Sequence, residues 1–470
     1  MKNTITRRDF VKTVGVASMA MPGLLQSVIK AQDIKSKPNI IFIVTDDQRW
    51  DTMGVMGNKI IQTPNMDYLA NNGLLFTNNY VTTSICCASR ASILTGQYTS
   101  RHKINDFNSS LSDEALQYTY PLLLKKAGYK IGFAGKYGVG IENQPKEYFD
   151  YWGIAEGHQP DYLNEDVDGN IIHDTDRCKK QIEYFINEFG KEEPFCLSVS
   201  FKAPHCQDGN PPGEEFIYQF RYEDLYEDVE FDEPINSEDS DWESFPEFFK
   251  ENNESRIRWK KRFATPELFQ ISMKNYYRLI TGVDDVLGSM MKQLKELNIA
   301  DNTIIVFTGD NGMYLGEHQM AGKWYGHEPS IRTPLFIYDP RLPKSKRGKR
   351  FPNISLNIDI APTILALAGI SIPKQMHGKN LLNLLNDADE WRKEFFYEHT
   401  VEIPTIPKSE GIVSPPYKYM VFTESEPKYE WLFNIEDDPD ERNNLALDTK
   451  YDSILNKYRG KYRRLKESAK

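Results

Sequence analysis

The stretch Pro38-Asn39-Ile40-Ile41-Phe42-Ile43-Val44-Thr45, followed directly by Asp46-Asp47, decides the fold class. A continuous run of apolar and β-branched residues is typical of a strand buried on both faces of a parallel sheet. A second such run, Thr303-Ile304-Ile305-Val306-Phe307-Thr308, is followed by Gly309-Asp310-Asn311-Gly312. Because open α/β sheets bind ligands outside the carboxyl ends of their strands, both groups of oxygen donors are expected at one edge of the sheet.

The segments around these two runs predict an α/β fold with a large, mostly parallel sheet flanked by helices. Strands are predicted at 130–134 and 195–201, and helices at 63–72, 121–127, 178–189 and 266–297. Such alternation of strands and helices is the signature of this class. After residue 378 the pattern changes to short aromatic-rich segments at 395–399, 417–422 and 431–434, followed by a basic helix near 451–468. We therefore expect one domain over 37–378 and a small antiparallel sheet with a terminal helix over 379–470.

The composition is that of a globular protein with an acidic balance. The 470 residues include 57 Lys and Arg against 68 Asp and Glu, which gives a net charge of −11. Binding to nucleic acid is not expected, because affinity for phosphate backbones comes mainly from clustered basic residues. Five cysteines, two of them adjacent, exclude a dense disulfide framework.

The first 31 residues are expected to be an export signal. Arg7-Arg8 and Phe10 precede an uncharged, moderately apolar run over 13–25, which is the pattern of a twin-arginine signal peptide. The run is shorter than the roughly 20 residues that span a bilayer, so stable membrane insertion is not expected. Cleavage near Ala31 would leave a periplasmic or secreted protein. The alternative is an ordinary amphipathic N-terminus of a cytosolic protein.

The side chains of Asp46, Asp47, Asp310 and Asn311 favour a hard divalent cation. They offer only oxygen ligands, and the sequence has no Cys or His pair at zinc-like spacing beside them. Calcium accepts more ligands in looser geometry, so Ca²⁺ is the first expectation and Mg²⁺ the second. A single Asp at a strand end is more often a turn or helix cap, but two such clusters together favour the metal site.

The segment Ser84-Ile85-Cys86-Cys87-Ala88-Ser89-Arg90-Ala91-Ser92-Ile93-Leu94-Thr95-Gly96 resembles the signature of the type I sulfatases of the alkaline-phosphatase superfamily. That signature has Cys, any residue, Pro or Ala, Ser and Arg, with Thr-Gly shortly after. Cys86 fits this register, whereas Cys87 does not. The resemblance implies an alkaline-phosphatase-like fold and oxidation of Cys86 to Cα-formylglycine by a maturation enzyme. The hydrated aldehyde offers one oxygen to attack sulfur and a second to expel sulfate.

The same resemblance assigns further residues. Asp46 and Asp47 correspond to the first metal pair of the family, and Asp310 and Asn311 to the second, with the modified Cys86 as a further ligand. The other residues that the resemblance implies are Arg90, which binds the diol and the metal-ligating acids; Lys136 and Lys323, which contact the sulfate; and His205, which protonates the leaving oxygen.

Gly138 departs from the family, because many relatives carry a His two residues after the first sulfate lysine. In those relatives the His helps to deprotonate the formylglycine hydroxyl, so this role is unassigned here. His158 is the nearest candidate substitute. The alternative is that His158 is a polar loop residue without a catalytic role.

The substrate is expected to be a sulfated carbohydrate, either a polysaccharide or a glycosaminoglycan fragment. The segment 207–263 is crowded with acids and aromatics, which suit sugar hydroxyls and sugar rings, so it is expected to shape the substrate pocket. The alternative is that this segment is a solvated, charged excursion of the chain. His102, Lys103 and Asn105 follow the signature segment and are further candidate sugar contacts. One alternative is a phosphomonoesterase or phosphodiesterase of the same superfamily, although the sequence lacks the extra Asp and His ligands of a two-metal site. The other is a glycan-binding relative without turnover, against which Cys86 and the basic residues argue.

Overall fold

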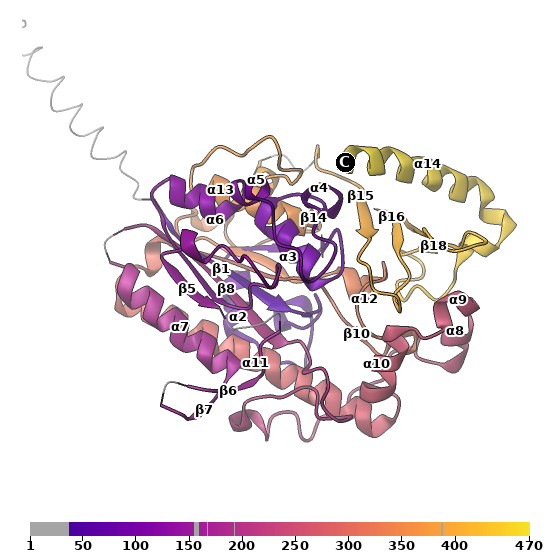
Figure 1. Cartoon of the computed structure of the whole chain (residues 1–470), viewed down its shortest axis with the longest axis horizontal. Helices are drawn as coiled ribbons and strands as arrows, with labels where there is room; N and C mark the ends of the chain where they lie inside the picture. The colour runs from indigo at the N-terminus through magenta and orange to yellow at the C-terminus, as the bar shows by residue number, and fades with distance from the viewer. Residues whose placement is uncertain (1–36, 155–158, 167, 192, 387–388) are drawn as a thin grey trace, which may run out of the picture. The chain divides into compact units, whose positions relative to one another are not determined.

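The structure is a computed structural model, and it describes residues 37–154, 159–166, 168–191, 193–386 and 389–470. The expected signal peptide over 1–31 and His158 lie outside the described residues. Residues 38–470 form one compact unit (Figure 1). It is built around an eight-stranded sheet of order β13-β2-β12-β9-β1-β8-β4-β5. The strands of this sheet are β1 (Asn39–Asp46), β2 (Leu74–Phe76), β4 (Lys130–Gly135), β5 (Tyr151–Ile154), β8 (Phe195–Pro204), β9 (Thr303–Gly309), β12 (Leu335–Tyr338) and β13 (Lys349–Phe351).

The centre of the sheet is parallel. Strand β1 pairs in parallel with β9 on one side and β8 on the other, and β8 pairs in parallel with β4. Strand β12 runs antiparallel to both β9 and β2. The expected large, mixed and mostly parallel sheet is therefore confirmed, and the four strands β9, β1, β8 and β4 end at the same edge.

Side chains of β1 alternate between two hydrophobic cores, one on each face of the sheet. Ile40, Phe42 and Val44 belong to the core under α3 (Cys86–Thr95), α6 (Tyr120–Lys126) and α13 (Ile360–Leu367). Ile41 and Ile43 belong to the core under α2 (Pro64–Asn71), α7 (Asp174–Phe189) and α11 (Pro266–Glu296). This burial on both faces explains why the strand is apolar at every position over 40–44. The predicted helices are present, and α7 begins four residues earlier than expected, where the His173 ring caps its first turn.

Shorter elements connect these layers. They are α4 (Thr99–His102), α5 (Asp113–Gln117), α8 (Asp239–Glu243), α9 (Glu247–Lys250), α10 (Glu254–Arg262), α12 (Glu328–Ile331), β3 (Asn79–Tyr80), β6 (Leu163–Glu165), β7 (Ile171–His173), β10 (Tyr314–Leu315), β11 (Ala321–Gly322) and β14 (Ser355–Leu356). Within the described ranges, no helix combines the length and apolar character needed to cross a bilayer.

A four-stranded antiparallel sheet and a terminal helix follow, as expected. They are β15 (Phe395–His399), β16 (Ser409–Ser414), β17 (Tyr417–Phe422), β18 (Glu430–Asn434) and α14 (Asp452–Ala469). Sequence analysis missed β16, whose Ser-Glu-Gly start lacks the aromatic pattern of its neighbours. One face of this sheet packs on α14, and the other face joins the core of the large sheet through Tyr397, Met420 and Trp431. Because the two sheets share a core, the boundary expected at residue 379 lies inside one compact unit.

Candidate active site

Four neighbouring strands deliver the predicted polar residues to one sheet edge. Asp46 ends β1, Asp310 follows β9, His205 follows β8 and Lys136 follows β4. The Asp47 backbone N–H donates to Asp310 Oδ1 at 3.1 Å, and Asp310 N–H donates to the Thr45 carbonyl at 2.9 Å. Asp47 has a φ of 63°, a left-handed conformation that Asp adopts more readily than most residues. These backbone contacts hold the acids of the two strand ends together.

The donor set suits a hard cation. Ligand atoms of Asp46, Asp47, Cys86 and His205 lie within 4.8 Å of one another. Among the described residues, Asn311 Oδ1 is a buried oxygen without a hydrogen-bond partner, although its amide nitrogen donates to Asp47. A buried carbonyl oxygen without a donor beside two carboxylates matches the ligand preference of calcium or magnesium.

Arg90 lies one helical turn after Cys86 on α3 and reaches the same acids. Its Nε donates to Asp310 Oδ2 at 2.8 Å, and its Nη1 donates to the Lys136 carbonyl at 2.9 Å and to the Ser200 hydroxyl. Gly138 packs directly against this side chain. An added Cβ at Gly138 would lie 2.7 Å from Arg90 Cδ, so Arg90 fills the space of a side chain at that position.

Two buried lysines neutralise the acids. Lys136 Nζ pairs with Asp46 Oδ2, while Lys323 Nζ pairs with Asp47 Oδ1 and lies 3.2 Å from Cys86 Sγ. Burial by itself raises the pKa of Asp46, but the positive charges of Lys136, Arg90 and Lys323 outweigh it and hold that pKa well below its usual range. The site therefore keeps the buried Asp46 carboxylate charged, whereas burial and the neighbouring Asp46 charge raise the pKa of Asp310 to about 7.

The two adjacent cysteines have different surroundings. Cys86 Sγ lies 3.4 Å from Asp46 Oδ1 at the floor of a pocket, whereas Cys87 packs in the hydrophobic core. Burial and the Asp46 carboxylate raise the pKa of the Cys86 thiol, so its thiolate is disfavoured. An unmodified Cys86 is accordingly a poor nucleophile.

His205 faces the acids through one ring nitrogen. Its Nε2 lies 3.5 Å from Asp47 Oδ2, and its Nδ1 lies 2.6 Å from the Cys206 carbonyl, to which it donates. Burial, together with the positive charge of Lys323, lowers the pKa of His205 to about 4. The nitrogen available to a ligand in the pocket is therefore Nε2.

A pocket of about 380 Å³ opens above Cys86. It is lined by Cys86, Phe107, Gln159, His205, Asp208, Glu254, Arg258, Lys323, Trp324, Ile403 and Ile406. Three of these residues come from the segment 207–263, as expected for a segment that shapes the pocket. Arg258 lies 5.1 Å from the centre of the Trp324 ring and pairs with Asp208 at 3.3 Å and Glu254 at 2.8 Å.

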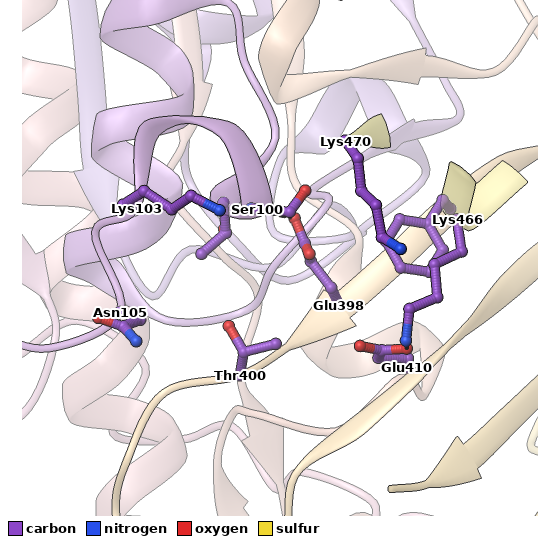
Figure 2. Close-up of a pocket in the computed structure, with 10 residues that line it drawn as sticks. Ser100, Lys103, Asn105, Glu398, Thr400, Glu410, Lys466 and Lys470 are labelled. Carbon is purple, nitrogen blue, oxygen red and sulfur yellow. Dashed lines mark hydrogen bonds and ion pairs between the residues drawn. The ribbon is translucent and has the colours of Figure 1, made fainter. Parts of the chain in front are cut away.

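Some pocket residues were missed by sequence analysis. Phe107, Ile403 and Ile406 are apolar loop residues without a local signal, and Trp324 could have been found only by its place beside Lys323. Conversely, the three predicted sugar contacts lie elsewhere. His102 is buried with Nε2 3.0 Å from Ser92 Oγ, and its Nδ1 accepts from the Ile104 N–H. Lys103 and Asn105 line a separate pocket (Figure 2).

Comparisons with known proteins give a family model, similar relatives and similar solved structures. Residues 38–370 match the family model described as sulfatase, and residues 316–468 match the C-terminal model of N-sulphoglucosamine sulphohydrolase. An N-acetylglucosamine-6-O-sulfatase of Bacteroides thetaiotaomicron is 30% identical, with 88% of this chain and 84% of the relative covered. An arylsulfatase of Clostridium perfringens is 30% identical, with 88% and 91% covered. A solved structure in complex with its substrate D-glucosamine-2-N,6-O-disulfate has a TM-score of 0.78 at 26% identity, with 92% of this chain and 98% of that chain covered.

Proposed function

The chain belongs to the sulfatase family of sulfuric ester hydrolases, and we propose that its substrate is a sulfate monoester on a polysaccharide or glycosaminoglycan fragment. The observation that carries this proposal is the position of Cys86, between the Asp46 carboxylate and the Lys323 ammonium at the floor of the pocket. The names of two relatives support a carbohydrate substrate, because one acts on an N-acetylglucosamine sulfate and the other was solved with a glucosamine disulfate.

Cys86 is the residue proposed for conversion to formylglycine by a maturation enzyme. Its buried thiol resists ionisation, and it opens into the pocket while Cys87 lies in the core. Once hydrated, the aldehyde supplies an oxygen nucleophile at this position. At this position the nucleophile would lie between the Asp46 carboxylate, which accepts hydrogen bonds, and the Lys323 ammonium group, which donates them.

The residues proposed to hold the divalent cation, Ca²⁺ before Mg²⁺, are Asp46, Asp47, Asp310, Asn311 and the modified residue 86. The buried Asn311 Oδ1 supports this assignment. When bound, the cation supplies fixed positive charge beside the sulfuryl group. In this structure Asp310 directs its oxygens to the Asp47 N–H and to Arg90, so Asp310 also positions its neighbours.

The basic residues would bind the sulfate oxygens. Lys136 and Lys323 are buried with their ammonium groups at the acid cluster, and Arg90 is held rigidly by Asp310 and Ser200. Fixed cations that face the developing negative charge stabilise the transition state more than flexible ones do. His205 would give a proton from Nε2 to the leaving oxygen as the imidazolium, because its Nδ1 proton is donated to the Cys206 carbonyl. An anionic ester bound beside the ring would raise the pKa of His205 from about 4 and so favour this doubly protonated form.

The wall of the pocket suits a sugar. The Trp324 and Phe107 rings offer apolar faces, and the linked side chains of Arg258, Asp208 and Glu254 offer donors and acceptors for hydroxyl groups. This side of the pocket is proposed to select the carbohydrate, while the acid cluster carries out ester cleavage.

Export through the twin-arginine route to the periplasm or beyond is part of the proposal, resting on Arg7-Arg8 and the apolar run that follows them. The role of base in sulfate release remains assigned to His158 as a prediction. Gly138 has no side chain, and Arg90 occupies the space beside it. Residue 138 therefore cannot supply the base.

The activity is tested by incubating purified, metal-loaded protein with a panel of sulfated monosaccharides and oligosaccharides and measuring the sulfate released. We expect turnover of at least one sulfated sugar, with Cys86→Ala as the inactive control. Faster release of phosphate from matched phosphate esters would favour the phosphoesterase alternative. Tight binding of sulfated sugars without turnover by protein carrying formylglycine would favour the glycan-binding alternative.

A further inference from the structure

A second pocket lies between the loop after α4, strand β15 and helix α14, and Figure 2 shows its polar side chains facing one another across it. Its volume is about 260 Å³. Three lysines line it, Lys103, Lys466 and Lys470, together with the carboxyl groups of Glu398 and Glu410. Lys103 comes from the segment that follows the signature helix, whereas the other two lysines come from the C-terminal end of the chain.

Lys103 supplies the positive charge of this pocket, because the other two lysines are paired with acids: Lys466 with Glu410, and Lys470 with Glu467 at 2.9 Å. Glu410 is neutralised by its ion pair with Lys466 and also accepts from the Tyr462 hydroxyl at 2.5 Å. Glu398 is buried and accepts from the Ser100 N–H at 2.9 Å. Burial raises the pKa of Glu398 to about 7, so it carries only part of a negative charge at neutral pH. Among the described residues, no carboxylate lies within ion-pair distance of Lys103 Nζ, and this ammonium group is exposed.

Two chain segments connect this pocket to the pocket above Cys86. Asn105 lines the second pocket and Phe107 lines the first, so the two linings are separated by only two residues, or about 7 Å of extended chain. The other segment starts with Thr400 at the second pocket and reaches Ile403 at the first. The Glu402 N–H donates to the Asn105 carbonyl at 3.4 Å, which ties the two segments side by side.

We propose that this second pocket binds an anionic group, sulfate or carboxylate, on another sugar residue of the same glycan chain whose ester is cleaved at Cys86. This inference rests on the proposed function in one respect, namely that a sulfate ester is cleaved at Cys86. Lys103 is the main determinant, because its charge is not used by an acid of the protein. The enzyme would then prefer sulfated oligosaccharides over sulfated monosaccharides.

The first test measures steady-state kinetics with a small aryl sulfate, a sulfated monosaccharide and an oligosaccharide that carries the same sulfated sugar plus further anionic residues. For Lys103→Ala we expect KM for the oligosaccharide to rise about 3- to 10-fold with little change in kcat, as for loss of one partly exposed ionic contact. KM for the two small substrates should not change. Lys103→Arg should restore oligosaccharide binding, and Lys295→Ala, which removes an exposed lysine of α11, should leave all three substrates unaffected.

A second measurement does not depend on turnover. Calorimetry should measure the Kd of the oligosaccharides for the Cys86→Ala variant and for the double variant Cys86→Ala/Lys103→Ala. The Kd of the double variant should be higher by the factor seen in KM, and the difference between the two Kd values should shrink at high salt. Oligosaccharides of matched length, with either a second sulfate or only a carboxylate, distinguish the two anionic groups. Equal effects of Lys103→Ala on small and large substrates, or no effect on the oligosaccharide, would overturn the inference while aryl sulfate turnover keeps the proposed function intact. Absence of turnover on every sulfate ester would overturn both.

Discussion

Arg90 occupies the space that a side chain at position 138 would need, because an added Cβ on Gly138 would lie 2.7 Å from Arg90 Cδ and 3.1 Å from Arg90 Nε. The same arginine binds Asp310, the Lys136 carbonyl and Ser200. Gly138 therefore determines how Arg90 is placed among the acids of the site. This contact gives a physical reason for a glycine at position 138.

Gly138→Ala should displace Arg90 and reduce kcat by at least tenfold. Gly138 has a φ of +72°, so the substitution also carries the cost of a left-handed residue, about 1 kcal/mol. Gly369 has the same φ of +72° with no atom within 4 Å of an added Cβ, so Gly369→Ala is a matched control for that cost. Thermal unfolding and kcat should show a larger loss for Gly138→Ala, and equal behaviour of the two variants would contradict the role of Gly138.

Cys86 and Cys87 should differ sharply in modification and in activity. Protein produced with the maturation enzyme should carry an aldehyde on residue 86 alone, detected by mass spectrometry of the peptide. Cys86→Ala should abolish sulfate release. Cys87→Ala should keep most of the activity and lose about 1 kcal/mol of stability, because it only removes a buried sulfur atom from the core. Full activity with an unmodified Cys86 would contradict the proposed nucleophile.

Removal of divalent cations should abolish turnover, and Ca²⁺ should restore it better than Zn²⁺. The ligand atoms around Asp46 and Asp47 include a buried oxygen of Asn311 without a partner among the described residues, which favours a hard cation. Added Ca²⁺ should also raise the melting temperature, because it binds only the folded protein. Asn311→Ala should weaken both effects in calorimetry and metal analysis. A variant with unchanged calcium content would show that Asn311 is not a ligand.

His205→Ala should slow cleavage most for substrates with poor leaving groups. The Nε2 atom faces the acid cluster and the pocket, and proton donation matters less when the departing oxygen is a stable phenolate. A series of aryl sulfates with increasing leaving-group pKa should therefore give a steeper dependence of kcat/KM in the variant than in the wild type. Parallel slopes would assign the proton to another donor.

Glu398 should make the free energy of unfolding depend on pH. Burial raises the pKa of Glu398 to about 7, above its value in the unfolded chain, so the folded state binds the proton more tightly. The resulting stability is fully present below the unfolded pKa of about 4.3 and is lost as the pH rises through 7, a change of about 3 to 4 kcal/mol. Glu398→Gln should therefore be more stable than the wild type at pH 8 but not at pH 4, as measured by urea unfolding. Glu296→Gln, at an exposed position, serves as the control.

Several features followed from local sequence alone. The central positions of β1 and β9, 40–44 and 304–307, are all apolar because both faces of these strands are buried, so their class was evident without the structure. Strand direction then placed Asp46 and Asp310 at the same sheet edge, where they lie. The spacing of Cys86 and Arg90 likewise determined that they share one face of α3, because residues four apart are neighbours on a helix.

Other features were decided only by tertiary structure, because they join segments that are hundreds of residues apart. Sequence analysis predicted that His102 and Lys103 both contact the substrate. In the structure the His102 ring lies against Ser92, and Lys103 lines a pocket that α14 completes. The wall formed by Phe107 and Ile403 has no local signal, since an apolar loop residue has the same local pattern whether it covers a core or lines a pocket. The C-terminal sheet was predicted from its alternation, but the placement of Trp431 in the core of the large sheet depends on long-range packing, which no local periodicity encodes.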